Sequence, residues 1–193
     1  LRQLAAGVIG ENLTKLEAID FANPLVSLLP IKFAAADGAP TAETACVGDE
    51  GYAAFRAQDR ITLGGQGARI VFTYASSEEK AQQLIAEIQS AGGMGKGFKS
   101  DASNFSAAHE LVDAAVAEFS TVDILVNNAG ITRDNLLMRM SEEHWDEIMN
   151  VNLKSVFNLT KAVIKPMLKA RSGSIINMSS VVGVKGNAGQ SNY

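Results

Sequence analysis

A hydroxyl and a phenol near the end of the chain are the groups best suited to chemistry. Ser180 and Tyr193 are joined by a loop that holds Gly183, Gly186 and Gly189, so the loop can fold back on itself. If the two side chains meet at one carbonyl oxygen, they could polarise that oxygen and exchange a proton with it. A serine and a tyrosine are also ordinary loop residues, and this alternative stays open on these two residues alone.

Asparagines occur at two further places where they need an explanation. Asn152 interrupts the apolar helical stretch 148–157, where a polar side chain either needs a partner or distorts the helix. Asn127-Asn128-Ala129-Gly130 follows an apolar run, and its Ala129 and Gly130 leave room for a flat ligand against the main chain. The alternatives are a capping or helix-breaking asparagine and a plain strand-ending turn.

The elements that must position these residues alternate between strand and helix patterns from residue 69 onward. Short apolar runs predict strands, and apolar residues at helical spacing predict the helices between them. This alternation is typical of βαβ units and predicts an α/β fold with a parallel sheet. The expected strands are 69–74, 96–100, 123–127 and 174–178, and the expected helices are 78–89, 106–119, 142–150 and 153–169.

Four segments follow the expected strands and should share one crevice. In open parallel sheets, ligands bind outside the carboxyl ends of the strands, because loops and helix N-termini meet there. The four segments are Thr73–Ser76, Asp101-Ala102, Asn127–Gly130, and Ser179-Ser180 with the loop to Tyr193.

Composition narrows the class of protein. Of the 193 residues, 47% are hydrophobic and 20% are charged, which is ordinary for one globular domain. The net charge of −4 and the absence of Lys/Arg runs argue against nucleic-acid binding. A single cysteine, Cys46, fits a reducing compartment, and the apolar stretch Leu25–Phe33 is too short to span a membrane. Charged residues interrupt the first thirty positions, so no signal-peptide core is present. We therefore expect a cytoplasmic protein without a membrane partner, and no spacing of His, Cys and carboxylates indicates a metal site.

Several segments, taken together and in order, carry a family resemblance. They are residues 122–140, Trp145, Asn152-Leu153, 173–180 and 186–193. This set resembles the bacterial 3-oxoacyl-[acyl carrier protein] reductases of the short-chain dehydrogenase/reductase family, over about residues 63–193. Gly-Ile-Thr-Arg-Asp at 130–134 and Gly-Asn-Ala-Gly-Gln at 186–190 favour this reductase over other members of the family.

The resemblance implies a fold, an activity and partners. The fold is a Rossmann-type doubly wound parallel sheet. The activity is the NADPH-dependent reduction of a 3-oxoacyl thioester, carried by acyl carrier protein, to the 3-hydroxyacyl thioester in fatty-acid biosynthesis. The family also implies a homo-oligomer, commonly a tetramer.

The resemblance further implies a catalytic set. Tyr193 would be the general acid that gives a proton to the substrate carbonyl oxygen, and Ser180 would hold that oxygen by a hydrogen bond. Asn152 would organise a water in the proton relay.

The remaining residues that the resemblance assigns are expected to bind the cofactor. The ribose and nicotinamide side of the cofactor would be lined by Asn128, Ala129, Gly130 and Tyr193. The adenine would be flanked by Asp101 and Ala102. Tyr74 and Ser76 end the strand at which an NAD enzyme carries an acidic residue for the ribose 2′-hydroxyl. Residues 73–76 hold no acid, so a 2′-phosphate is not repelled and NADP/NADPH is the expected cofactor.

Two features of the family are missing from the sequence. The family opens with a strand and a Thr-Gly-x-x-x-Gly turn that holds the pyrophosphate, whereas residues 46–61 hold only Gly48 and Gly51. The family's tyrosine is followed four residues later by a lysine, and this sequence ends at Tyr193. We therefore expect an incomplete fold, with an aberrant first βα unit and without the last strands. The expected division is an atypical segment over 1–62 and a partial Rossmann domain over 63–193.

These departures leave other interpretations open. The chain could be a piece or a damaged reading of a genuine reductase, or a non-catalytic module that uses the helix 153–169 to associate with a relative. A sugar-nucleotide epimerase shares the tyrosine but is not expected to carry Asn-Asn-Ala-Gly. Whether the substrate carrier is acyl carrier protein or coenzyme A also stays open.

Overall fold

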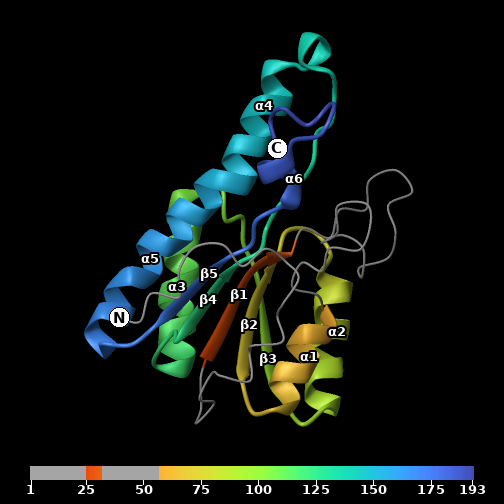
Figure 1. Ribbon diagram of the computed structural model, residues 1–193. Coiled ribbons are helices and arrows are strands. Elements are labelled where there is room, and N and C mark those ends of the chain that lie inside the picture. Colours follow the sequence, from red (N-terminus) through yellow and green to blue (C-terminus); the bar gives the residue numbers. More distant parts are fainter. Residues whose placement is uncertain (1–24, 32–56) are drawn as a thin grey trace.

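A parallel sheet of five strands lies at the centre of the protein, in a computed structural model that describes residues 25–31 and 57–193 (Figure 1). The strand order is β3-β2-β1-β4-β5, and every neighbouring pair runs parallel. The strands are β1 (Leu25–Ile31), β2 (Arg69–Tyr74), β3 (Met94–Lys99), β4 (Ile124–Asn127) and β5 (Ser174–Asn177).

Helices cover both faces of this sheet, as expected of a doubly wound fold (Figure 1). Helices α1 and α2 lie on one face, and α3 and α5 lie on the other. The helices are α1 (Ala57–Gly65), α2 (Glu78–Ser90), α3 (Phe105–Phe119), α4 (Glu142–Ile148), α5 (Ser155–Ala170) and α6 (Val181–Lys185), with a 3₁₀ turn at Leu137–Arg139 and a π-helical segment at Met149–Lys154. The predicted Rossmann-type fold class is confirmed. No helix in the described ranges has the length and apolar character to cross a bilayer.

The core consists of two apolar clusters, one on each face of the sheet. Ile70 and Phe72 of β2 pack with α1 and α2, whereas Val71 between them packs with α3 and α5. This division follows from the strand period of two, which sends successive side chains to opposite faces. Residues 70–72 are all fully buried, because a parallel strand covered on both faces reads as a continuous apolar run.

Strand β1 was not predicted, because no strand was expected within residues 1–62. β1 lies in the middle of the sheet and pairs with β2 and β4, for example through Val26 with Ile70 and Ile124. Its register with β2 shifts between Leu28 and Ile31, around Pro30, which has no N–H to donate to a strand ladder. The expected boundary at residue 62 falls inside α1, and the division into two segments stays a prediction. Gly48 and Gly51 lie outside the described residues.

The other expected elements are observed within a few residues of their predicted bounds. β2 has the predicted range, and α3 begins one residue earlier than expected. Ser77 precedes α2 without a side-chain capping bond, whereas Ser141 caps α4 by accepting a hydrogen bond from the His144 N–H at 3.3 Å.

Gly64 of α1 and Gly93 before β3 approach each other too closely for a side chain. A Cβ on Gly93 would lie 2.5 Å from the Gly64 carbonyl carbon and 2.7 Å from its oxygen. We expect Gly93→Ala to destabilise the fold by about 1–3 kcal/mol, because backbone must move to relieve the overlap. Urea denaturation measures the loss. Gly183→Ala is the control, since nothing lies within 4 Å of a Cβ there. Equal stability of the two variants would show that α1 does not pack as described.

Candidate active site

The residues that follow β4 are tied to β5 and α5 by a buried amide. Asn127, at the end of β4, is 4% exposed. Its Nδ2 donates to Thr160 Oγ1 of α5 at 3.3 Å and to Asn177 Oδ1 of β5 at 2.8 Å. The Met178 N–H also donates to the Asn127 carbonyl at 2.9 Å. The ends of β4 and β5 therefore hold a set position relative to each other, and Ser180 follows directly from this point.

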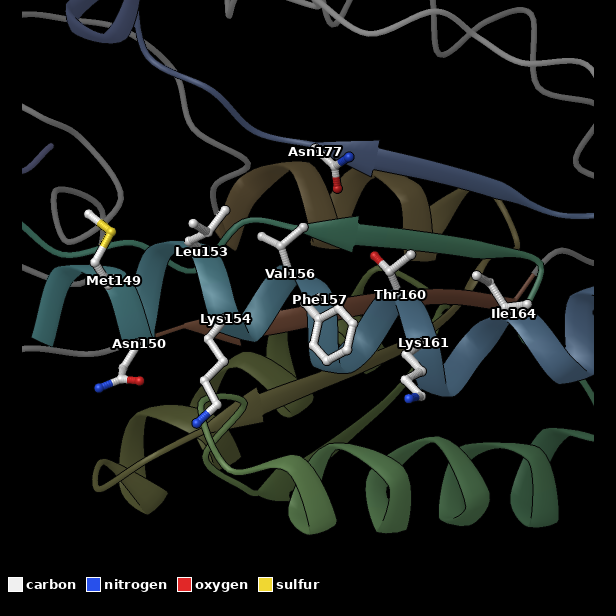
Figure 2. Close-up of a pocket in the computed structure, with 10 residues that line it drawn as sticks. All are labelled: Met149, Asn150, Leu153, Lys154, Val156, Phe157, Thr160, Lys161, Ile164 and Asn177. Atoms are coloured by element: carbon white, nitrogen blue, oxygen red, sulfur yellow. The ribbon is translucent and has the colours of Figure 1, made fainter. Parts of the chain in front are cut away.

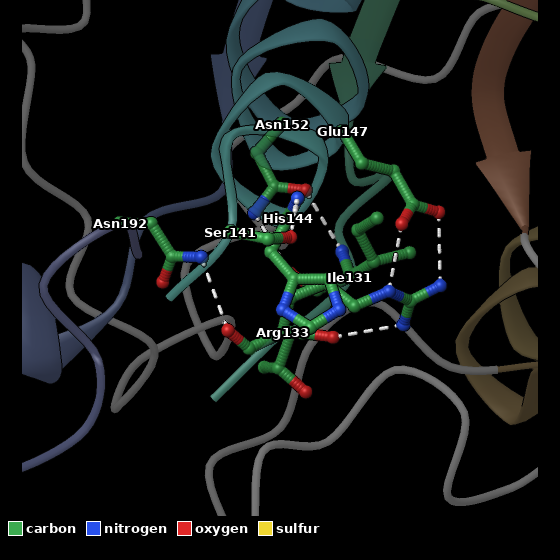
Figure 3. Close-up of polar contacts among 8 residues, drawn as sticks. Ile131, Arg133, Ser141, His144, Glu147, Asn152 and Asn192 are labelled. Carbon is green, nitrogen blue, oxygen red and sulfur yellow. Dashed lines mark hydrogen bonds and ion pairs between the residues drawn. The ribbon is translucent and has the colours of Figure 1, made fainter. Parts of the chain in front are cut away.

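Asn152 holds the main chain just beyond Gly130. The Ile131 N–H donates to Asn152 Oδ1 at 2.8 Å, and Asn152 Nδ2 donates to the Ile131 carbonyl at 2.9 Å (Figure 3). Asn152 lies in the π-helical segment between α4 and α5, so it both finds a partner and accompanies a distortion of the helix. A role toward a water stays a prediction and would use the second proton of Nδ2 or the second lone pair of Oδ1.

Residues 133–135 bind the loop that leads to Tyr193. Asn192 Nδ2 donates to the Arg133 carbonyl at 3.1 Å, and Gln190 Nε2 donates to Asp134 Oδ2 at 2.9 Å. The Asn135 N–H donates to the carbonyl of Gly189 at 2.8 Å. The segments 130–134 and 186–190, which carried much of the family resemblance, are thus hydrogen-bonded neighbours in the fold.

An ion pair fastens the same segment to α4. The Arg133 guanidinium donates from Nε to Glu147 Oε2 at 2.7 Å and from Nη2 to Glu147 Oε1 at 2.9 Å (Figure 3). This bidentate geometry fixes orientation as well as distance. Both side chains are more than a third exposed, so the pair orients the segment more than it stabilises the fold.

The Ser141 cap at the start of α4 also affects the protonation of Glu143. The hydrogen bond from Ser141 lowers the pKa of the exposed Glu143 carboxyl below its ordinary value, with a smaller effect from the backbone. We expect Ser141→Ala to destabilise α4 by about 1 kcal/mol at neutral pH. A carboxyl group whose pKa is lower in the folded than in the unfolded protein stabilises the fold at pH values above its unfolded pKa, which is about 4.3 for Glu. This stabilisation is lost as the pH falls through the folded pKa. Denaturation at neutral and acidic pH should therefore show a smaller Ser141→Ala effect in acid. When Glu143 is also replaced by Gln, the effect of Ser141→Ala on stability should no longer change with pH. If that effect does not change with pH while Glu143 is present, the Ser141 bond is not what lowers the pKa of Glu143.

Ser180 and Tyr193 lie at the two ends of the segment that contains α6. Ser180 is the N-cap of α6, and its Oγ accepts from the Val182 N–H at 3.2 Å. Tyr193 is 37% exposed, and its N–H donates to the Gln190 carbonyl at 3.1 Å. Figure 1 shows the C-terminal end next to α6, on the side of the sheet where β5 ends. The structure thus places both residues at the expected edge of the sheet.

The expected cofactor residues differ in how far they are accessible. Ser76, Asp101 and Gly130 are exposed at the ends of β2, β3 and β4. Tyr74 is 7% exposed, and its ring packs in the core beside α1 and α2. Ala102 is 2% exposed.

A fully buried asparagine supports the β3 end and was not singled out from the sequence. Asn158 of α5 donates from Nδ2 to the carbonyls of Ala102 at 2.9 Å and Ser103 at 3.0 Å. Its position among apolar residues on the inner face of a helix was the available signal, because a buried amide needs partners. Asp101 Oδ1 accepts from the Ser103 N–H at 2.9 Å and from Ser103 Oγ at 2.7 Å, which fixes the turn.

An open groove of about 720 Å³ lies elsewhere, along α5. Figure 2 shows its lining side chains, which come from the π-helical segment, α5 and the end of β5. Neither Ser180 nor Tyr193 is among them. The lining residues are Met149, Asn150, Leu153, Lys154, Val156, Phe157, Thr160, Lys161, Ile164 and Asn177.

The parallel sheet with polar residues at its carboxyl edge defines a Rossmann-type protein, and comparison with known proteins gives the family. Residues 60–193 match the family model described as short chain dehydrogenase. The chain therefore belongs to the short-chain dehydrogenase family.

Three curated relatives of this chain are named 3-oxoacyl-[acyl-carrier-protein] reductase FabG. The protein from Staphylococcus epidermidis is 43% identical over 133 residues, which are 69% of this chain and 54% of the relative. The Vibrio cholerae protein is 51% identical over 131 residues, and the Escherichia coli protein is 48% identical over 132 residues. Each of these two matches covers 68% of this chain and 52% of the relative. The chain thus spans about half the length of the curated relatives it matches.

Solved structures support the same fold. A mutant short-chain dehydrogenase/reductase from Serratia marcescens superposes with a TM-score of 0.70 at 25% identity, over 88% of this chain and 61% of that protein. An NAD⁺-bound xylitol dehydrogenase superposes with a TM-score of 0.72 at 22% identity, over 89% of this chain and 58% of that protein. The second likeness concerns the fold alone.

Proposed function

We propose that this chain carries the active-site serine, asparagine and tyrosine of an NADPH-dependent 3-oxoacyl thioester reductase whose substrate is linked to acyl carrier protein. The observation that carries the proposal is the hydrogen-bonded contact between residues 133–135 and 189–192, which brings the Tyr193 loop to the end of β4. The shared name of the relatives at 43–51% identity supports the substrate class.

In this proposal two side chains act on the substrate carbonyl and a third supports them. Tyr193 gives a proton to the carbonyl oxygen, and Ser180 donates its hydroxyl proton in a hydrogen bond to the same oxygen. Asn152 keeps the main chain at Ile131 in place and contributes to proton supply through a water. When bound, the reduced nicotinamide supplies a hydride to the carbonyl carbon.

The described residues fit such a cofactor at the sheet edge. A Cβ on Gly130 would have Asn152 Oδ1 as its nearest neighbour at 3.8 Å, so the main chain there is open to a flat group. Asn128, Ala129 and Gly130 would hold the ribose and nicotinamide side, with Tyr193, and Asp101 and Ala102 would flank the adenine. The Thr-Gly-x-x-x-Gly turn that binds the pyrophosphate in the family is missing from this sequence, and residues 32–56, between β1 and α1, lie outside the described ranges.

The end of β2 supports a preference for NADPH. Ser76 is exposed, and residues 73–77 hold no carboxylate. Lys99, also exposed, ends β3 and pairs with Tyr74 in the sheet, so a positive charge lies near this corner.

Ser76→Asp is expected to weaken NADPH binding by at least about tenfold, because a carboxylate would face the 2′-phosphate. NADH binding should be unchanged or improved. Fluorescence titration of both cofactors measures the change, and Ser76→Asn is the uncharged control of similar size. Equal NADPH affinity in the Asp and Asn variants would remove the argument for the 2′-phosphate at this corner.

The test of the proposed reaction is NADPH oxidation, followed at the reduced-nicotinamide absorbance band with acetoacetyl thioesters of acyl carrier protein and of coenzyme A. It is run on this chain and on a version extended to a lysine four residues beyond Tyr193. We expect turnover in the extended version, faster with the acyl carrier protein thioester. No turnover with either thioester in either version would refute the proposal.

A second candidate, an assembly module, is favoured by the outer face of α5. Leu153, Phe157, Ile164 and Leu168 are 64%, 56%, 44% and 59% exposed along one helix and its π-helical start. Apolar exposure of this kind marks interaction surfaces. The homo-oligomer that the family resemblance implies would bury this face of α5. Light scattering combined with an NADPH titration separates the candidates, since association without cofactor binding would favour the module.

A further inference from the structure

Asn192, directly before Tyr193, is buried in a loop whose other residues are mostly exposed. Its side chain is 3% exposed, whereas Ser191 and residues 186–188 are exposed. Burying an amide costs free energy unless it is hydrogen-bonded. Nδ2 donates to the Arg133 carbonyl at 3.1 Å, and Oδ1 is buried with no hydrogen-bond partner among the described residues. An apolar side chain would fill the space without that unbonded oxygen, so the amide is explained by its Nδ2 bond rather than by packing.

The acceptor of this bond belongs to a firmly held segment. The Arg133 side chain is paired with Glu147 of α4, and Asn152 binds both main-chain groups of Ile131 two residues earlier. The hydrogen bonds that join Gly189 to Asn135 and Gln190 to Asp134 hold the part of the loop before Ser191. Among these contacts, the Asn192 bond is the one next to Tyr193 in the chain.

We propose that Asn192 is a positioning residue that holds Tyr193 against the segment after β4, so that the phenol keeps its place beside the substrate carbonyl. The catalytic meaning of this role rests on the proposed function, whereas the structural link to Arg133 does not. The side chain must donate to a carbonyl. Asp has the same size but carries only acceptors when ionised, so Asn192→Asp removes the bond and sets two oxygens against each other.

The test follows Tyr193 directly by ¹⁹F NMR of the full chain labelled with 3-fluorotyrosine. The chain has three tyrosines, and Tyr193→Phe assigns the signal of interest. The Tyr74 ring is buried in the core, so its signal reports whether the domain stays folded. In the wild type, we expect the Tyr193 signal to have the width of a folded domain and a shift away from free fluorotyrosine.

In Asn192→Asp, the Tyr193 signal should narrow and move to the free position while the Tyr74 signal stays unchanged. Ser191→Ala, an exposed neighbour on the same loop, should leave both signals as in the wild type. An unchanged Tyr193 signal in Asn192→Asp would overturn the proposal.

A measurement on the wild type covers the case in which the Asp variant fails to fold. The Asn192 side-chain amide protons should exchange with solvent at least about tenfold more slowly than those of Asn187, because the Asn192 amide is bonded and buried, whereas the Asn187 amide, which donates to Gln190 Oε1 at 2.8 Å, is exposed. Exchange at the Asn187 rate would equally overturn the proposal.

The kcat of the Asn192→Asp variant, compared with its KM for NADPH, gives a further test that a purely structural role of Asn192 would not pass. If the extended chain turns over, Asn192→Asp should lower kcat by about 10²-fold, the effect of misplacing a reacting group by about 1 Å. The KM for NADPH should change less than kcat, because Tyr193 is the one expected cofactor residue that the substitution displaces. Absence of turnover in the wild type would count against the proposed function, whereas the NMR result would still decide the role of Asn192.

Discussion

Replacing Asn152 by leucine is expected to destabilise the domain by about 2–5 kcal/mol. The side chain satisfies both main-chain groups of Ile131, at 2.8 and 2.9 Å, and Ile131 is 8% exposed. Removing the amide leaves a donor and an acceptor unpaired in a buried place, and each such group costs about 1–3 kcal/mol. Chemical denaturation followed by circular dichroism measures the loss. It should appear as a lower midpoint with an unchanged slope.

Asn150 offers a matched control, because it is the same residue type in the same π-helical segment but is exposed. Asn150→Leu should change stability by about 0.5 kcal/mol or less. Asn152→Asp should also be destabilising at neutral pH, since a carboxylate oxygen would replace the donor to the Ile131 carbonyl. If Asn152→Leu is as stable as Asn150→Leu, the two bonds to Ile131 do not form in solution.

Under the proposed function, replacing Tyr193 by phenylalanine in the version extended to the lysine is expected to lower turnover of the 3-oxoacyl thioester by about 10²–10⁴-fold, the range for loss of a general acid. The substitution removes only the phenol oxygen. The loop should keep its place, because its anchors are Asn192, Gln190 and Gly189 rather than the Tyr193 ring. NADPH affinity should therefore change less than kcat, because the loss at the cofactor is limited to any contact that the phenol oxygen makes with it.

A pair of serine variants supports the interpretation of the Tyr193 result. Ser180→Ala should lower kcat by about 10²–10³-fold through loss of a hydrogen bond to the carbonyl oxygen, whereas Ser179→Ala should not. Ser179 is exposed directly beside Ser180, so it controls for disturbance of the strand end. Turnover by Tyr193→Phe close to that of the parent chain would refute the role of the phenol, whatever the serine variants do.

Local pattern was sufficient to predict most helices and strands. β2 was predicted with its observed bounds because its apolar run is continuous, and α3 because its buried residues recur at helical spacing. β1 was missed because Pro30 and the uneven composition of residues 1–62 hide the strand pattern. The strand becomes evident only from its pairing with other strands. Those partners, β2 and β4, lie far away in the sequence.

The candidate site could be predicted only in part. The sequence pointed to Asn152 as a polar residue in an apolar helix, and the structure supplied its partner Ile131. Asn192 gave no clear local signal, because an asparagine in a loop is usually solvated, and Asn158 had as its signal only a place among apolar residues of a helix. Their burial depends on how α5 packs on the β3 end and how the last loop folds over Arg133.

What the sequence determined by itself is the order of the strands and helices from β2 to β5, the parallel α/β class and the side chains capable of chemistry. These follow from the spacing of neighbouring residues, which the backbone geometry of helices and strands converts into faces. Only the tertiary structure decided which polar groups meet. Asn152 and Ile131 are 21 residues apart in the chain, and Asn192 and Arg133 are 59 apart. The first pair joins the segment after β4 to the π-helical segment before α5, and the second joins it to the loop after α6, so the bonds depend on packing that no local pattern encodes.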